Sequence, residues 1–206
     1  MTESAGERDT YRVEAFSDGV FAIAITLLVL EFKVPRLGPA ASGPELWAAL
    51  QTLWPSLVAF LGSFAAILIM WINHHGLFRM VRRVDAPFLY ANGAMLLMVT
   101  FVPFPTAVLA EYLGHAGERV AAAFYCGTFV AVSLTFQLWW YTANRRRLLQ
   151  AHVTPAAVAR IWGAYRFGLA VYVAATLLSF WKAVAGLGLC VALWVYWAAL
   201  SYRAES

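Results

Sequence analysis

Four ionisable residues, Glu14, Asp18, Glu31 and Lys33, interrupt an otherwise apolar stretch near the start of this chain. The stretch, residues 13–34, would be about 33 Å long as a helix, which matches the thickness of a bilayer's hydrocarbon core. A charged side chain is costly at that depth unless it faces protein or water. These residues therefore indicate either the interior of a helical bundle or a path for ions.

The composition of the chain fixes its class. Hydrophobic residues make up 62% of the 206 positions, charged residues only 13%, and the mean hydropathy is +0.68. So few polar residues cannot coat a soluble globule of this size. The net charge of +4 would suit nucleic acid, but the arginines lie beside apolar runs and not in a basic, aromatic-rich domain. We expect an integral membrane protein that binds lipid bilayer and no nucleic acid.

Six apolar segments, separated by polar, proline or glycine residues, are long enough to cross a membrane. We place them at about residues 13–34, 46–76, 87–113, 119–144, 156–181 and 182–202, within one domain of residues 1–206. The second is longer than a bilayer needs, and Pro55 near its start suggests an interfacial turn or a kink. Pro103 and Pro105 are expected to kink the third, which frees carbonyls near Val99 and Phe101 for neighbouring helices. The sequence predicts an all-α membrane protein.

Arginine residues are distributed unevenly between the two sides of the predicted bundle. One side holds Arg12, Arg79, Arg82, Arg83 and the run Arg145, Arg146 and Arg147, and the other holds Lys33, Arg36, Arg119 and Lys182. By the positive-inside rule both termini are cytoplasmic, which agrees with an even number of spans in a multi-pass protein of the plasma membrane. The run of three arginines is expected to anchor lipid headgroups, with a specific phospholipid or regulatory site as the alternative.

The first predicted helix carries a narrow apolar stripe. On a helical wheel Ile23, Leu27 and Leu30 fall within about 60° of one another, with Thr26 at the edge of the same arc. Periodicity alone favours ordinary helix packing for this stripe. If the stripe instead lines a central axis, Asp18, about 140° from Ile23, points back into its own subunit.

A carboxylate that points into the bundle needs a partner. The candidates near the same end of the bundle are Arg12, Ser17, Asn73, His74 and His75. Three further polar residues in the apolar runs, Asn92, Ser133 and Gln137, are expected to hydrogen-bond between helices, with an ion or substrate path as the alternative.

Three motifs resemble those of a known family. They are Arg12-x-x-x-Phe16-Ser17-Asp18-Gly19 followed by FAIAITLLVLE over residues 21–31, WINHH over residues 71–75, and VPFPT over residues 102–106. In this order they resemble the prokaryotic relatives of the endolysosomal potassium channel known as transmembrane protein 175. The resemblance covers the six-span layout and most of the chain, and the first-helix motif is its specific part.

The resemblance implies a homotetramer of six-helix subunits in which the first helix of each lines one pore. It places a hydrophobic constriction at Ile23, Leu27 and Leu30, with Thr26 offering a ring of hydroxyls. Rings of this kind gate by dewetting, and potassium ions in transit lose their water shell at a lower cost than sodium. The Thr-Val-Gly-Tyr-Gly filter of ordinary potassium channels is absent. Selectivity would therefore come from side chains, and no cofactor is implied.

The resemblance also implies a network that ties the first helix to the second through a histidine. It would contain Arg12, Phe16, Ser17 and Asp18, together with Trp71 and one of the adjacent pair His74 and His75. The sequence does not choose between the two histidines, and a satisfied packing histidine is the alternative. A metal site is not expected, because no cysteine or acidic ligand accompanies them at ligand spacing.

We interpret the chain as a potassium-preferring cation channel with a hydrophobic constriction on the first helix. It is not an enzyme, because it contains no nucleotide loop, nucleophile with its base, or paired carboxylates. The alternative is a proton- or cation-coupled secondary transporter, for which Asp18, Glu31 and Arg166 would be the coupling groups. A structural or receptor subunit is a third class.

Overall fold

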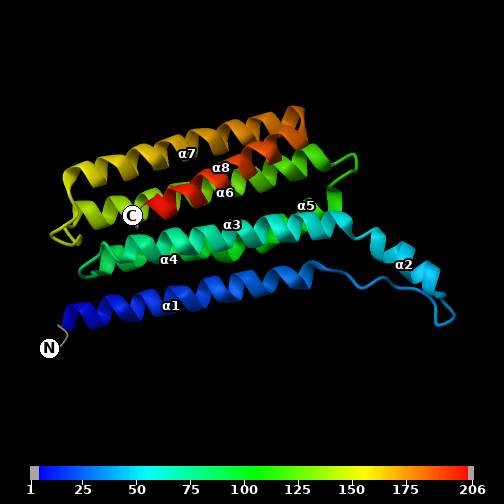
Figure 1. Ribbon diagram of the computed structural model, residues 1–206, viewed down its shortest axis with the longest axis horizontal. Helices are drawn as coiled ribbons and strands as arrows, with labels where there is room; N and C mark the ends of the chain where they lie inside the picture. Colours follow the sequence, from blue (N-terminus) through cyan, green and yellow to red (C-terminus); the bar gives the residue numbers. More distant parts are fainter. Residues whose placement is uncertain (1–4, 204–206) are drawn as a thin grey trace.

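The chain folds into long helices that run side by side along one axis (Figure 1). The computed structural model describes residues 5–203, with side-chain surroundings for residues 9–200, so the ends of the predicted domain of residues 1–206 lie outside the described residues. The elements are α1 (Ala5–Leu27), η1 (Leu28–Glu31), α2 (Gly43–Gln51), α3 (Trp54–Phe78), α4 (Ala86–Phe101), α5 (Pro103–Tyr112), α6 (Glu118–Arg145), α7 (Pro155–Trp181) and α8 (Ala183–Arg203). Within the described residues, six helical segments are long and apolar enough to cross a bilayer. The all-α, six-span fold class is therefore confirmed.

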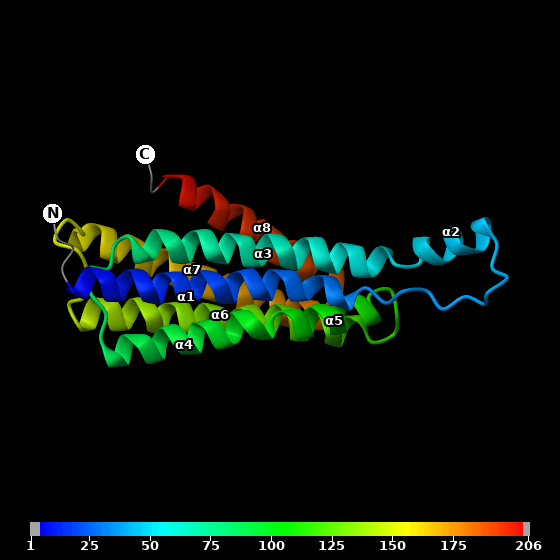
Figure 2. The same ribbon diagram turned by 90° about the horizontal axis from the view of Figure 1, so that it is seen from below.

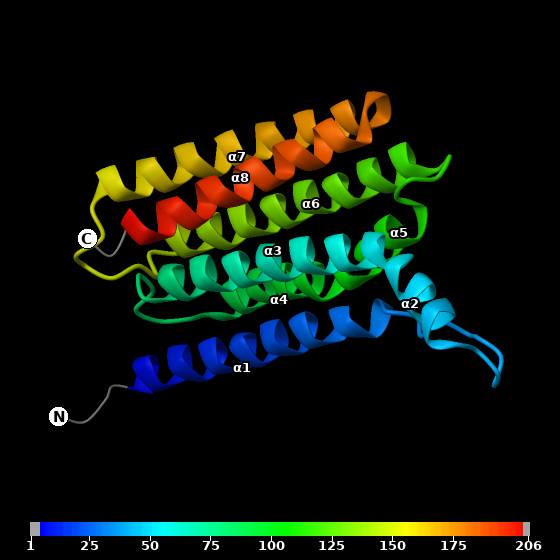
Figure 3. The same ribbon diagram turned by 45° about the vertical axis from the view of Figure 1, so that its right-hand side comes forward.

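The first helix occupies one edge of the bundle. Figures 1 and 3 place α1 at one edge and α7 at the opposite edge, with the other long helices between them. Helix α1 packs mainly on α3 and α4, whereas α6 contacts α4, α5, α7 and α8. In Figure 2, which looks at this edge, α1 crosses the view between α3 and α4. One side of α1 is therefore left uncovered by the elements within residues 5–203.

Two of the predicted spans begin or end elsewhere in the structure. Helix α1 begins at Ala5, because a helix can extend beyond the apolar stretch into the polar residues before it. The helical segment ends with η1 at Glu31, so Lys33 and Val34 lie in the connection that follows. The predicted second span is divided into α2 and α3. Pro55 lies in the first turn of α3, where a missing N–H costs no helical hydrogen bond. Helix α2 projects beyond the bundle (Figure 3).

The predicted kink in the third span is confirmed as a break at Val102, between α4 and α5. The carbonyl of Val99 is met locally, by the N–H of Val102 at 3.2 Å, and not by a neighbouring helix. Thr106 follows the break and joins a buried cluster, in which the Ser63 hydroxyl lies 2.7 Å from the Thr106 hydroxyl and 2.8 Å from that of Tyr125. This cluster ties α5 to α3 and α6.

The arginine-rich loops meet at one end of the bundle. The α3–α4 loop and the α6–α7 loop exchange two backbone hydrogen bonds, from Arg82 N to Leu148 O and from Gln150 N to Met80 O, both of 2.8 Å. Arg146 donates to Asp85 at 2.8 Å across the same junction. Helix α1 begins and α8 ends at this end as well (Figure 1). The predicted grouping of arginines on one side thus corresponds to one end of the helices.

Candidate functional site on the first helix

The apolar stripe of α1 lies on the uncovered side of the subunit. Ile23, Leu27 and Leu30 are 58%, 38% and 71% exposed, whereas Phe21 and Leu28 on the opposite side are buried against the bundle. The division follows from helical geometry, because residues three, four and seven positions apart share a face. Ordinary core packing within one subunit is therefore excluded for the stripe.

Three more of the predicted site residues share this exposed face. Thr26 is exposed and its hydroxyl donates to the carbonyl of Ile23 at 2.9 Å, so the oxygen lone pairs still point outward. Arg12 and Phe16 are also exposed, because they lie within about 20° of Ile23 on the wheel. Neither belongs to the buried network of a single subunit, which corrects that part of the expectation. The predicted role of Arg12 and Phe16 in supporting the first helix stays a prediction.

Asp18 points toward its own bundle, and its partner is Trp71 of α3. The indole Nε1 donates to the Asp18 carboxylate at 2.8 Å. Trp71 was not among the five candidates drawn from the sequence. A cation, hydroxyl or imidazole was expected for a carboxylate, but the axial offset between α1 and α3 brings a neutral indole donor to the right height. Trp71 therefore joins the first helix directly and not only as a neighbour of the histidines.

His75 contacts a carboxylate that the sequence-based network did not contain. Its Nδ1 lies 2.9 Å from Glu14 Oε1, and its ring stacks on Trp71 with centroids 6.1 Å apart. Glu14 lies one helical turn before Asp18. This i, i+4 spacing is the sequence feature from which a role for Glu14 beside Asp18 could have been predicted. The carboxylates of Glu14 and Asp18 thus face His75 and Trp71, respectively, on successive turns of α1.

His74 is fully buried and reaches α1 through Asn92 of α4. Asn92 Nδ2 donates to the Ser17 hydroxyl at 3.0 Å, and Asn92 Oδ1 lies 3.0 Å from Trp139 Nε1 and 3.2 Å from His74 Nε2. An indole N–H only donates, so Oδ1 is the acceptor and His74 carries its proton on Nε2. Ser17 in turn donates to the Val13 carbonyl at 2.8 Å.

Both histidines therefore connect the second span to the first, by different routes. His74 acts through Asn92, and His75 contacts Glu14. Asn92 hydrogen-bonds between helices as expected, whereas Ser133 Oγ and Gln137 Nε2 are buried without a partner among the described residues. Trp139 was missed because no local pattern marks it: its position depends on how α6 packs against α4.

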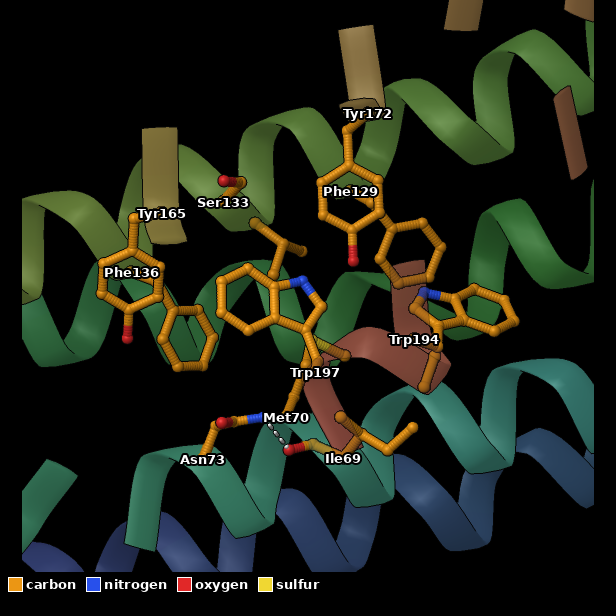
Figure 4. A pocket seen from close by; sticks show the side chains of 12 residues that line it. Ile69, Met70, Asn73, Phe129, Ser133, Phe136, Tyr165, Tyr172, Trp194 and Trp197 are labelled. Carbon is orange, nitrogen blue, oxygen red and sulfur yellow. Dashed lines mark hydrogen bonds between the residues drawn. The ribbon is translucent and has the colours of Figure 1, made fainter. Parts of the chain in front are cut away.

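A small cavity lies inside the bundle, away from the exposed face of α1 (Figure 4). It has a volume of about 50 Å³ and lies between α3, α6, α7 and α8. Half of its lining residues are aromatic, and none of the twelve residues shown is charged. Asn73 at its edge donates to the carbonyl of Ile69 at 2.8 Å. At about 10–15 Å³ for each water the cavity suits a few water molecules and not a hydrated cation.

The three groups required by the transporter alternative do not meet. Glu31 ends the first membrane span, Asp18 contacts Trp71, and Arg166 is exposed on α7 at the opposite edge of the bundle (Figure 1). A coupled transporter is expected to gather its polar groups at one midplane site. The geometry gives this alternative no such site among the described residues.

Comparisons with known proteins agree with the layout of the helices. The family model described as the endosomal/lysosomal potassium channel TMEM175 matches residues 12–103. A protein of Chamaesiphon minutus named a potassium channel is 50% identical over 199 residues, which cover 96% of this chain and 98% of that protein. A crystal structure of a TMEM175 homologue from the same organism, described as a lysosomal potassium-selective channel, has 48% identity and a TM-score of 0.81. The match covers 94% of this chain and 98% of that one.

A vertebrate protein is also similar over most of this chain. The Bos taurus protein named endosomal/lysosomal proton channel TMEM175 is 34% identical over 179 residues. These residues cover 82% of this chain and 36% of the bovine protein.

Proposed function

Since the chain belongs to the TMEM175 family of potassium channels, we propose that it is a potassium-preferring cation channel whose pore is lined by α1 of four subunits. The family conducts ions and is not a family of enzymes. The observation that carries the proposal is the apolar face of α1, on which Ile23, Leu27 and Leu30 are exposed in the described part of the subunit. A fourfold arrangement of this face encloses an axis with rings of branched apolar side chains.

The rings of Ile23, Leu27 and Leu30 form the barrier to ions. A ring of such side chains is too dry for a hydrated ion, so passage requires partial loss of the water shell, and that loss costs less for potassium than for sodium. The Thr26 hydroxyl adds oxygen ligands between the apolar layers. Selectivity in this mechanism comes from side chains and not from a carbonyl filter.

The polar contacts of α1 hold the barrier in register. Asp18 with Trp71, Glu14 with His75, and Ser17 with Asn92 fix the rotation of α1 about its own axis. A shift of one residue turns a helix by about 100°, which would replace the stripe by other side chains. The carboxylates therefore support the pore and do not coordinate the permeating ion.

The arginine-rich end faces the cytoplasm in this proposal, and the channel lies in the plasma membrane with both termini inside. The uneven distribution of arginines between the two ends supports that orientation. Proton permeation is a second candidate, favoured by the name of the bovine relative, a proton channel.

Bilayer recording of the purified protein tests the proposal. With potassium on one side and sodium on the other, we expect a reversal potential that reports preference for potassium. We also expect a current that needs no second ion gradient and does not saturate as that gradient is raised. A reversal potential at zero would reject the potassium preference. Saturable exchange driven by a second gradient would instead support the transporter. A pH gradient under symmetric potassium measures proton flux separately.

A further inference from the structure

A groove of about 610 Å³ lies at the arginine-rich end of the molecule, far from α1. One wall of the groove is a face of α7 that includes Trp162 and Arg166. The other wall contains Arg147 and Leu149, which belong to the segment that follows α6. Figure 1 shows this segment at the end of the bundle where the chain termini lie. Two guanidinium groups, an indole and aliphatic side chains therefore line one open groove.

Arg147 holds a backbone conformation that disfavours it. Its φ of 56° is left-handed, and it is the one non-glycine residue with a positive φ among residues 5–203. The N–H of Arg147 bonds Asn144 O at 3.1 Å and the N–H of Leu148 bonds Ala143 O at 2.9 Å, which makes Arg147 the residue that closes α6. Glycine is usual at this position, because a side chain is crowded there. The arginine is a poor choice for the turn itself, which points to a role for its side chain.

Arg166 is unusually deep for a charged residue. It lies eleven residues into α7, whose membrane span covers Pro155–Trp181. A helix of 27 residues is about 40 Å long and exceeds the hydrocarbon core by about 10 Å, so the Arg166 backbone lies about 10 Å below the boundary. The side chain is exposed and lines the groove, and an arginine side chain is long enough to bring its guanidinium toward the headgroups.

Neither guanidinium of the groove has an acidic partner among the described residues. Helix α7 contains no Asp or Glu. The adjacent Arg146, by contrast, pairs with Asp85 at 2.8 Å. An uncompensated charge at the depth of Arg166 is costly, and an anion in the groove would remove that cost.

The surroundings of α7 identify the source of the anion. Helix α7 lies at the edge of the subunit opposite α1, so lipid covers it when α1 faces a central axis (Figures 1 and 3). Trp162, one turn nearer the end of the helix than Arg166, has the side chain that membrane interfaces favour. Basic pockets between helices on the cytoplasmic side suit phosphate headgroups.

We propose that this groove binds an anionic glycerophospholipid of the cytoplasmic leaflet, with Arg147 and Arg166 on the headgroup phosphate and Trp162 beside the glycerol backbone. The planar fork of each guanidinium offers two hydrogen bonds to a phosphate. Leu149 and the aliphatic side chains of α7 contact the first carbons of the acyl chains. The groove is separate from the proposed pore, and lipid binding does not require ion conduction.

Fluorescence quenching of the full-length protein in nanodiscs tests the proposal. The probes are phosphatidylglycerol and phosphatidylcholine with a 6,7-dibromostearoyl chain, and the Trp162 signal is the difference between the wild type and Trp162→Phe. We expect phosphatidylglycerol to quench Trp162 at least about threefold more than phosphatidylcholine. Arg147→Gln with Arg166→Gln should bring the two lipids to equal quenching. Arg145→Gln, which removes a neighbouring exposed charge outside the groove, should keep the preference.

A second variant separates lipid binding from a structural role. Arg147→Gly relieves the left-handed strain, so we expect a higher thermal midpoint together with a weaker preference for phosphatidylglycerol. Three results would overturn the proposal: equal quenching by the two lipids in the wild type, the same loss in Arg145→Gln, or an unchanged preference in both Arg147→Gly and the double variant. Displacement of the lipid by millimolar glycerol phosphate would also overturn it, since the groove would then be a site for a soluble phosphate.

Discussion

Single residues on α1 have opposite roles according to the face they occupy. Ile23, Leu27 and Leu30 are exposed, and the carboxylates of Glu14 and Asp18 meet partners on α3. The charged groups that first attract attention in this span therefore position the helix, and the apolar residues beside them form the proposed barrier.

Changes at the exposed face should alter conduction directly. Ile23→Asn or Leu27→Asn supplies oxygen ligands and retains water in the constriction, so we expect higher conductance and a smaller potassium preference. Thr26→Val removes an oxygen without widening the pore and should reduce selectivity alone. The measurement is the reversal potential between potassium and sodium, with Leu177→Asn on exposed α7 as the matched control. Leu28 is not a suitable control, because it is fully buried. If Leu177→Asn responds and Ile23→Asn does not, α1 does not line the pore.

The bond between Asp18 and Trp71 should affect stability and not selectivity. Trp71→Phe removes the indole donor and leaves the carboxylate half-buried without its partner, at a cost on the order of 1 kcal/mol. Asp18→Asn keeps an acceptor for Trp71 and should cost less. We expect both variants to lower the thermal midpoint in detergent while the potassium-to-sodium reversal potential stays close to that of the wild type. A large shift of the reversal potential in a fully assembled Asp18→Asn variant would mean that Asp18 faces the ions.

At the scale of elements, the polar contacts that hold α1 against the bundle are concentrated in its first half. Three polar contacts lie within Glu14 to Asp18, and the Thr10 hydroxyl lies 3.5 Å from the Arg82 carbonyl. Beyond Asp18, apolar side chains such as Phe21 and Ala24 pack against the bundle, and α1 ends in the turn η1. Helix α4 contributes to these contacts, because Asn92 forms hydrogen bonds with side chains of three other helices. The fold therefore sets the rotation of the proposed pore helix from a cluster one or two turns away from the constriction.

Asn92 should be the most sensitive polar residue of this cluster. Asn92→Ala leaves Ser17, His74 and Trp139 with unmet hydrogen-bonding atoms in the core, and each costs about 1 kcal/mol or more. We expect a loss of about 3 kcal/mol in unfolding free energy. Ser17→Ala, which removes one of these contacts, should cost about 1 kcal/mol. Equal effects of the two substitutions in chemical unfolding would show that Asn92 does not join the helices as described.

The junction between the α3–α4 and α6–α7 loops should weaken in acid. Although partial burial opposes it, the hydrogen bonds from Arg146 and from the Phe88 N–H hold the pKa of Asp85 below its ordinary value of 3.8. A lowered folded pKa gives stability that is complete above the unfolded value and is lost as the pH falls through the folded value. Thermal unfolding at pH 2.5 to 6 should show a decline below about pH 4 that Asp85→Asn reduces. An unchanged acid decline in Asp85→Asn would assign it to other carboxylates.

At the scale of the whole molecule, the proposed pore needs more than one subunit. One α1 cannot enclose an axis, and α1, whose apolar residues are exposed, lies at one edge of the bundle (Figure 1). We expect native mass measurements in mild detergent to give four times the 22.8 kDa of one chain. Leu30→Glu on the exposed face should dissociate the complex, whereas Leu177→Glu on α7 should leave it intact. Monomers alone, across several detergents, would count against the proposed pore.

The sequence alone determined the features that the membrane imposes on each helix separately. The length of the apolar segments predicts six spans, and the positive-inside rule predicts that the arginines gather at one end of the bundle. Pro103 and Pro105 predict the break at Val102. Helical periodicity predicts that Asp18 and Ile23 lie on opposite sides of the first helix. Each of these depends on one segment of chain, so a local pattern is enough to predict it.

Only the tertiary structure decided which groups meet. The choice of Trp71 for Asp18, the different routes of His74 and His75, the exposure of Arg12 and Phe16, and the groove between Arg147 and Arg166 depend on how far neighbouring helices slide and rotate against one another. A slide of one turn moves a side chain by about 5.4 Å, which is more than the length of a hydrogen bond. No periodicity within a single helix encodes that offset, because it is set by the packing of side chains from several helices at once.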